Sequence, residues 1–78
     1  MRIKVKLFAS LKRFAEVKPG TPFDVELPEG ACLQDLVNKL NIPPQEAKVV
    51  FVNGIAHPMD WTLNPDDEVG IFPPIAGG

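Results

Sequence analysis

The sequence contains few of the residues from which catalytic and metal sites are built. Its 78 residues include one cysteine, one histidine and no tyrosine. A single cysteine cannot form an intramolecular disulfide, which excludes a small secreted fold held together by such bonds. The one acidic cluster, residues 66–68, lies beside Pro65 in a predicted turn, and we interpret it as a solvated turn rather than a cation site. We expect neither a catalytic acid–base set nor a metal centre.

Long apolar runs are also missing. No stretch approaches the ~18 apolar residues that a membrane span needs. Residues 1–6 alternate apolar and basic side chains, unlike a secretory signal peptide. We therefore expect a protein of the reducing cytoplasm that does not bind a membrane.

The chain is weakly acidic, and its charge is unevenly distributed. The formal net charge is −2, from 8 basic and 10 acidic residues. Residues 1–20 hold six of the basic residues and one acidic residue. A basic end could steer an acidic partner toward the chain, although a solvated sheet face explains the same charges. Nucleic-acid binding is not expected, because no aromatic residues are interleaved with the basic ones in a stacking pattern.

The pattern of apolar residues predicts one small domain over residues 1–78. Ile3, Val5 and Leu7 alternate with basic residues, which is typical of a half-buried strand. Asn53-Gly54 follows an apolar, valine-rich run and predicts a tight hairpin, because both positions tolerate positive φ. The expected strands cover residues 2–8, 23–27, 49–52, 55–57 and 68–72, with a turn or short helical piece at 9–15 and turns at 18–22 and 63–67.

One amphipathic helix is predicted in the middle of the chain. Its apolar stripe consists of Leu33, Leu36, Val37 and Leu40. Residues 41–44 include two prolines, which cannot continue the hydrogen bonds of a helix and should end it. The order of elements then predicts an α+β fold in which one main helix covers a sheet.

Phenylalanines are predicted on the sheet face opposite the helix. Phe8 and Phe72 each follow an inward-facing residue of the first and last strands, so both should point outward. Phe51 points the same way if its two valine neighbours are buried. An uncovered apolar patch on a small domain marks a partner surface. The alternative is that Phe8 and Phe72 fold over the edge of the core at the strand ends.

The C-terminal segment, residues 73–78, most strongly suggests a function. Pro73 and Pro74 favour an extended path away from the sheet. At ~3.3 Å per residue the segment would reach about 20 Å. Gly77 and Gly78 lack a Cβ, so they fit a channel too narrow for side chains, where the Gly78 carboxylate would be the reacting group. A frayed end without a function is the alternative.

Together these residues resemble the MoaD/ThiS-type sulfur carriers of the ubiquitin-like, β-grasp superfamily. The resemblance covers the whole chain and is most specific in the final heptad, residues 72–78. Weaker matches lie at residues 3–9, 28–30, 52–54 and 67–69. Within the family, the chain is most similar to the small subunit of molybdopterin synthase. The resemblance implies a β-grasp fold with a mixed sheet.

The resemblance implies a carrier that binds no cofactor and is not a catalyst by itself. In this family, a ubiquitin-activating-like adenylyltransferase uses ATP to adenylate the terminal carboxylate, and a sulfur donor protein converts the product to a thiocarboxylate. The tail then enters the large subunit of molybdopterin synthase, where the sulfur attacks a pyranopterin precursor.

Residue by residue, the resemblance gives Gly78 as the acceptor of sulfur and Gly77 as the residue that provides clearance. The threading tail corresponds to Pro73, Pro74, Ile75 and Ala76. Phe8 and Phe72 match hydrophobic docking positions, and the alternation of the strands adds Phe51. Cys32 replaces the Ser or Thr that many relatives have at the helix start, so a weak helix cap is expected.

Other functions stay open. A carrier of this family could serve thiamine, cysteine or thiolated tRNA synthesis, although thiamine-type carriers tend to be shorter and to lack the diproline. A ubiquitin-like modifier would be joined through Gly78 to lysines of target proteins. An interaction module of the same fold would have an inert tail.

Overall fold

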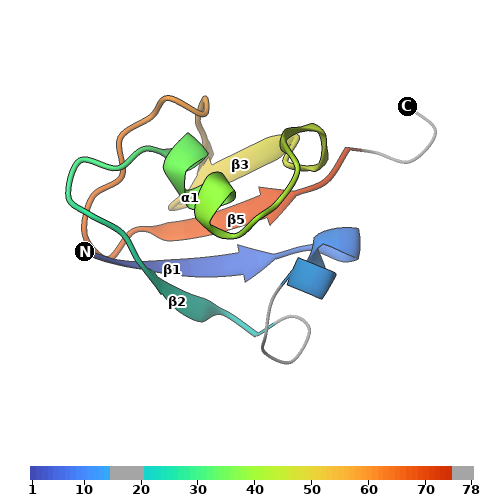
Figure 1. The fold of residues 1–78 in the computed structure, drawn as a ribbon, viewed down its shortest axis with the longest axis horizontal. Coiled ribbons are helices and arrows are strands. Elements are labelled where there is room, and N and C mark those ends of the chain that lie inside the picture. Colours follow the sequence, from blue (N-terminus) through green and yellow to red (C-terminus); the bar gives the residue numbers. More distant parts are fainter. Residues whose placement is uncertain (15–20, 75–78) are drawn as a thin grey trace.

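Five strands form one mixed sheet, and one α-helix lies across one of its faces (Figure 1). The computed structural model describes residues 1–14 and 21–74. The sheet order is β2-β1-β5-β3-β4, with β1 parallel to β5 and the other neighbours antiparallel. The elements are β1 (Arg2–Leu7), η1 (Ala9–Phe14), β2 (Phe23–Glu26), α1 (Leu33–Lys39), η2 (Pro44–Glu46), β3 (Val49–Val52), β4 (Ile55–Ala56) and β5 (Glu68–Phe72), where η denotes a 3₁₀ helix. The predicted α+β fold and its five strands are confirmed, and η2 is an element that the sequence did not predict.

The core lies between the sheet and α1. The central strands β1 and β5 bury alternate side chains, and their parallel register places Val5 beside Val69 and Leu7 beside Ile71. Helix α1 contributes the buried side chains of its predicted stripe, Leu33, Leu36 and Val37. Full burial of one such side chain contributes roughly 1.5–3 kcal/mol. Alternation in the sequence is therefore the direct cause of the two-layer fold.

The helix ends before the prolines that were expected to end it. Asn41 has a φ of 60°, and its N–H donates to the carbonyl of Asn38. The N–H of Ile42 donates to the carbonyl of Val37, and these two bonds form a Schellman motif that satisfies the last carbonyls of the helix. The helix thus ends near the predicted place but not because of Pro43 and Pro44. Asn41, which has the left-handed backbone conformation, ends it before the prolines are reached.

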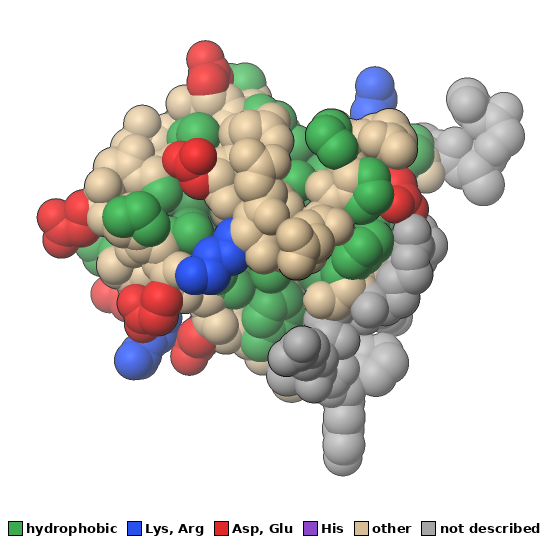
Figure 2. Space-filling model, in the orientation of Figure 1, with side chains coloured by type: hydrophobic (Ala, Val, Ile, Leu, Met, Phe, Trp, Pro, Cys, Tyr) green, Lys and Arg blue, Asp and Glu red, His purple; other side chains and the backbone are tan. Residues whose placement is uncertain are grey.

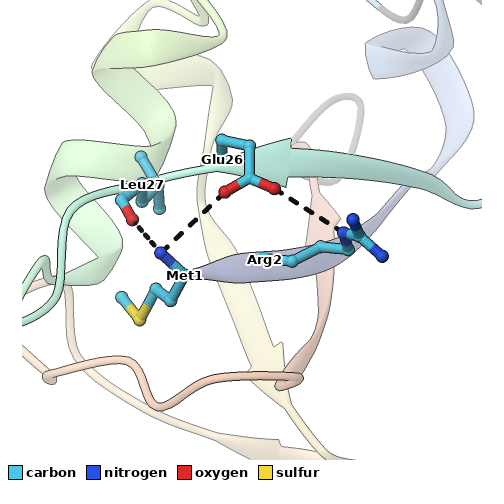
Figure 3. A network of polar contacts seen from close by, with 4 residues as sticks. All are labelled: Met1, Arg2, Glu26 and Leu27. Carbon is cyan, nitrogen blue, oxygen red and sulfur yellow. Dashed lines mark hydrogen bonds and ion pairs between the residues drawn. The ribbon is translucent and has the colours of Figure 1, made fainter.

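A small polar network joins Met1 and Arg2, at the start of β1, to Glu26 and Leu27, at the end of β2 and directly after it (Figure 3). The Met1 ammonium donates to the carbonyl oxygen of Leu27 at 2.6 Å and lies 3.9 Å from a carboxylate oxygen of Glu26. The other oxygen of Glu26 is 3.6 Å from Nε of Arg2. Exposed ion pairs of this kind contribute little to stability, so the backbone carbonyl is the more important partner.

The helix side of the molecule has a mixed surface. Figure 2 shows hydrophobic, acidic and basic side chains interspersed on this side. Within residues 1–14 and 21–74, no helix is long and apolar enough to cross a membrane.

The acidic cluster at residues 66–68 lies at a turn in which Asp66 and Glu68 are exposed, as the sequence predicted, but Asp67 is not solvated. The side chain of Asp67 is buried, with 7% of the residue exposed. Its two oxygens accept hydrogen bonds from the N–H of Asn64 at 2.8 Å and from Nδ2 of Asn53 at 3.0 Å. Asn53 is the first residue of the predicted hairpin turn, where it and Gly54 both have positive φ. Asp67 therefore joins the β3–β4 turn to the start of β5.

We predict that Asp67→Ala lowers the free energy of unfolding by about 2 kcal/mol, because two donors lose their buried acceptor. Urea denaturation would measure this loss. Asp60→Ala is the matched control, since Asp60 is exposed and should change stability by less than about 0.5 kcal/mol. Equal effects of the two substitutions would contradict the structural role of Asp67.

We predict that Cys32→Ser raises the free energy of unfolding by roughly 0.5–1 kcal/mol. Cys32 is the N-cap of α1, with φ −106° and ψ 176°, and its N–H already donates to the Asp35 carboxylate at 2.9 Å. A serine hydroxyl at this position would accept a hydrogen bond from the first turn better than a thiol does. The measurement is the urea midpoint, and Cys32→Ala, which has no acceptor, should show no gain.

Candidate functional site

Three phenylalanines gather on the sheet face that α1 does not cover, and we call them the phenylalanine cluster. The rings of Phe8 and Phe72 are stacked, with centroids 4.1 Å apart and planes at 6°. Phe51 meets Phe72 edge to face at 5.5 Å and 81°. All three residues are half-buried. Stacked and edge-to-face pairs stabilise one another, so the cluster is a defined surface although it lies outside the core.

Strand alternation produces the cluster, as the sequence predicted. Phe51 lies between the buried Val50 and Val52, and Phe72 follows the buried Ile71. Among the described side chains that pack against the core, two are phenylalanines, Phe14 and Phe23, and neither belongs to the cluster. The outward orientation of the three rings is therefore confirmed, and the alternative that Phe8 and Phe72 fold over the core is wrong.

A hollow of about 480 Å³ lies beside the phenylalanine cluster. Besides the three rings, its lining includes the backbone of Gly70 and the side chains of Lys4, Lys6 and Glu68. Sequence reasoning missed Gly70 and Lys6, although both hold outward positions by the same alternation that revealed the phenylalanines. A glycine in the interior of a strand is itself a signal of close packing above the backbone. We call this space the docking hollow.

The tail begins at the phenylalanine cluster. The carbonyl of Phe72 accepts a hydrogen bond from the N–H of Lys48 at 3.0 Å, and the carbonyl of Ile71 accepts one from the N–H of Phe8 at 3.2 Å. These bonds fix the last residues of β5 between β3 and β1. Pro73 is half-buried and Pro74 is exposed, so the chain leaves the sheet there. The remaining tail residues of the prediction, Ile75, Ala76, Gly77 and Gly78, lie outside the described residues.

Other candidate groups lie away from this face. His57 stacks on Trp61 at 4.2 Å and 25°, and Trp61 packs against the core. Cys32 is partly exposed at the start of α1. In the part of the chain that the structure describes, no three His, Cys, Asp or Glu residues come together as a metal-binding group. The arrangement therefore offers an exposed aromatic surface beside the point where the chain leaves the sheet.

Comparison with known proteins agrees with this geometry. A family model described as the ThiS family matches residues 5–78. A solved structure from Pyrococcus furiosus, described as molybdopterin converting factor, subunit 1, is 31% identical with a TM-score of 0.74, and the match covers 95% of this chain and 98% of that chain. No curated protein matches the chain.

Two further structures share the fold at lower identity. Small archaeal modifier protein 1 of Haloferax volcanii is 22% identical with a TM-score of 0.76, over 95% of this chain and 98% of that chain. In the complex of subunits 1 and 2 of the molybdopterin-converting factor from Helicobacter pylori 26695, the matching chain is 18% identical with a TM-score of 0.63, over 100% of both chains. The predicted ubiquitin-like β-grasp fold is confirmed.

We predict that Phe72→Ala lowers the free energy of unfolding by about 1–2 kcal/mol, because its half-exposed ring loses mainly its two ring contacts. Leu36→Ala is the matched comparison in the core and should cost about 2–5 kcal/mol, because a fully buried side chain leaves a cavity. Urea denaturation of both variants measures the difference. A larger loss for Phe72→Ala would place this ring in the core and contradict its assignment to a partner surface.

Proposed function

The chain belongs to the ThiS family, and we propose on that basis that it is a sulfur carrier whose Gly78 carboxylate is adenylated and converted to a thiocarboxylate. The observation that carries the proposal is the family match over residues 5–78, which includes the whole tail as well as the folded body. We further propose that the sulfur is used in molybdopterin synthesis. This step is supported by the 31% identity to a protein described as molybdopterin converting factor, subunit 1.

The proposed chemistry begins with activation of a poor electrophile. The negative charge of the Gly78 carboxylate is delocalised, so its carbon resists attack. An adenylyltransferase of the ubiquitin-activating type would use ATP: a carboxylate oxygen attacks the α-phosphorus, and pyrophosphate leaves. The resulting mixed anhydride has AMP as a good leaving group. A sulfur nucleophile at the oxidation level of sulfide, supplied by a donor protein, then forms the C–S bond as the C–O bond to AMP breaks.

The thiocarboxylate sulfur would act as the nucleophile in the next step. It attacks a carbon of a cyclic pyranopterin phosphate held by a large catalytic subunit, and the new C–S bond forms as a C–O bond to the phosphate breaks. Water then cleaves the acyl C–S bond of this thioester, which leaves the sulfur on the pterin and returns the carrier to the carboxylate. The chain from Helicobacter pylori that shares this fold belongs to a structure described as a complex of subunits 1 and 2 of the molybdopterin-converting factor. This description supports a two-subunit assembly as the setting for the step. The catalytic groups belong to these partners, and the carrier supplies the reacting end.

The folded body would aim this end. Phe8, Phe51 and Phe72 form the proposed docking surface, and Phe72 is also the last residue of β5. Pro73 and Pro74 follow directly and lead to Ile75, Ala76, Gly77 and Gly78. A partner that covers the cluster therefore fixes the position at which the tail leaves the sheet. The tail then has fewer positions to sample before it enters the partner's channel. This reduction of orientational freedom favours reaction.

A ubiquitin-like modifier is the second candidate. The fold of small archaeal modifier protein 1 matches this chain with a TM-score of 0.76. A modifier would use the same adenylated Gly78 but would form an amide with a lysine of a target protein. The chemical form of the end therefore distinguishes the two functions, and the partner that accepts the sulfur distinguishes molybdopterin synthesis from thiamine, cysteine or tRNA thiolation.

We predict that the chain gains the mass difference between one sulfur and one oxygen, confined to its C-terminal peptide, when incubated with its adenylyltransferase, ATP and a sulfur donor. Intact-mass analysis followed by peptide mapping measures this change. Deletion of Gly78, or addition of one bulky residue after it, should abolish the gain, because the reacting carboxylate is lost or moved. Lys39→Ala on the opposite layer is the control and should behave as wild type.

Conjugates of Gly78 with lysines, without any thiocarboxylate, would assign the modifier function instead. An unchanged mass for the wild-type chain with active enzyme and donor would overturn the sulfur-carrier proposal.

A further inference from the structure

The β3–β4 turn contains the one asparagine–glycine pair of the sequence, Asn53-Gly54. Asparagine is a chemically labile residue, and its side-chain amide is lost most easily before glycine, because no side chain shields the next backbone nitrogen. Asn53 and Gly54 are both exposed, and a Cβ added to Gly54 would meet nothing within 4 Å. Water therefore has access to this turn, and the space beside the reacting atoms is open.

The reaction available to this pair is deamidation. The Gly54 nitrogen loses its proton to water and attacks Cγ of Asn53. A bond from this nitrogen to Cγ forms as the bond from Cγ to Nδ2 breaks, and ammonia leaves with a proton supplied by water. Water then opens the cyclic imide at one of its two carbonyls. The product is aspartate or, where the backbone continues through Cγ, isoaspartate, and no oxidant or reductant is needed.

In the folded chain, both polar atoms of the Asn53 amide are held by the segment that begins β5. Nδ2 of Asn53 donates to Oδ1 of Asp67 at 3.0 Å, and Oδ1 of Asn53 accepts from the N–H of Glu68 at 3.0 Å. Asp67 is itself buried and fixed by the N–H of Asn64 at 2.8 Å. To bring Cγ within bonding distance of the Gly54 nitrogen, the Asn53 side chain must rotate and break both of its bonds. The network thus opposes the reaction.

The product of the reaction could not restore this network. A carboxylate would replace the amide that now donates to Asp67, so two negative charges would meet where a hydrogen bond had been. Isoaspartate would also lengthen the backbone of a two-residue turn by one carbon atom. Gly54 and Glu68 line the docking hollow as well, so the altered turn would lie at the edge of this surface. The change is therefore one-way.

We propose that Asn53 is a deamidation site that Asp67 keeps closed, and that local separation of the β3–β4 turn from β5 starts its irreversible modification by water. The inference does not depend on the chemistry of the tail. It gives Asp67 the role of a positioning residue, which acts through the orientation of the Asn53 amide. It also states the route: the turn opens locally, without unfolding of the domain.

The test is the rate of deamidation of Asn53, followed by peptide mapping that separates the asparagine, aspartate and isoaspartate forms. The same chain in concentrated urea gives the rate without structure. The folded wild-type chain should react at least about tenfold more slowly than the unfolded chain, because it must first break two hydrogen bonds. Asp67→Ala should raise the rate of the folded chain about tenfold, because one of these bonds, to a charged acceptor, is lost.

Leu36→Ala is the matched control, because it removes a fully buried core side chain and leaves the bonds of Asn53 in place. It should destabilise the domain at least as much as Asp67→Ala and still react at the wild-type rate. Circular dichroism shows that each variant is folded in the assay. If Asp67→Ala does not fold, Asp67→Asn replaces it, and its single side-chain oxygen, shared by two donors, should give a smaller rise.

Three results would overturn the inference. Equal wild-type rates in the folded chain and in urea would show that the network does not protect Asn53. An unchanged rate in Asp67→Ala, or an equal rise in Leu36→Ala, would show that the network does not control the reaction. Absence of reaction in urea would remove Asn53 as a modification site.

Asn53→Asp tests the one-way character of the change, because it reproduces one of the two products. It should lower the urea midpoint by at least half as much as Asp67→Ala does. Asn41→Asp is its control, since Asn41 is exposed and also has positive φ, and it should lower the midpoint much less. A wild-type midpoint for Asn53→Asp would show that the network tolerates the product, which would contradict a one-way change.

Discussion

The parallel pairing of β1 with β5 is the constraint on which the rest of this molecule depends. The register that places Val5 beside Val69 in the core also places Lys6 beside Gly70 on the opposite face. Because side chains alternate along a strand, a slip of one residue would exchange the two faces, burying lysine and exposing valine. The same burial that stabilises the domain therefore fixes the composition of its exposed face, so stability and recognition have a single physical origin.

Strand β5 connects this constraint to the proposed chemistry. It lies in the middle of the sheet between β1 and β3, and the segment that follows Phe72 is the proposed working end. Hydrogen bonds from Phe8 and Lys48 to the end of β5 hold the place where the tail begins. A partner docked on the phenylalanine cluster would therefore find the tail at a fixed origin. This division of labour, with a rigid body and partner-supplied catalytic groups, agrees with the few catalytic residue types in the sequence.

The parts of the structure that could be predicted are those governed by local periodicity. Strands β1 and β5, α1 and the Asn53-Gly54 turn lie within about one residue of their expected bounds, because one buried face enforces a regular pattern. The neighbour order of the strands depends on contacts distant in sequence, so alternation alone could not give it. The burial of Asp67 was missed for the same reason, since one of its donors comes from the β3–β4 turn. The outward rings were predictable, whereas the docking hollow depends on how they pack over Gly70.

The adjacency of β1 and β5 also affects how the protein is made. Strand β1 is synthesised before the other four strands of the sheet, and its parallel neighbour β5 is synthesised after them, so the sheet closes only when β5 has been made. Pairing over so long a separation is slow, and the unpaired edge of β1 is exposed in the interval. A polypeptide released before Glu68 would lack the centre of its sheet. A chain that stops before β5 thus cannot form the proposed docking face, so this face exists only in molecules that also carry the start of the proposed sulfur-bearing segment.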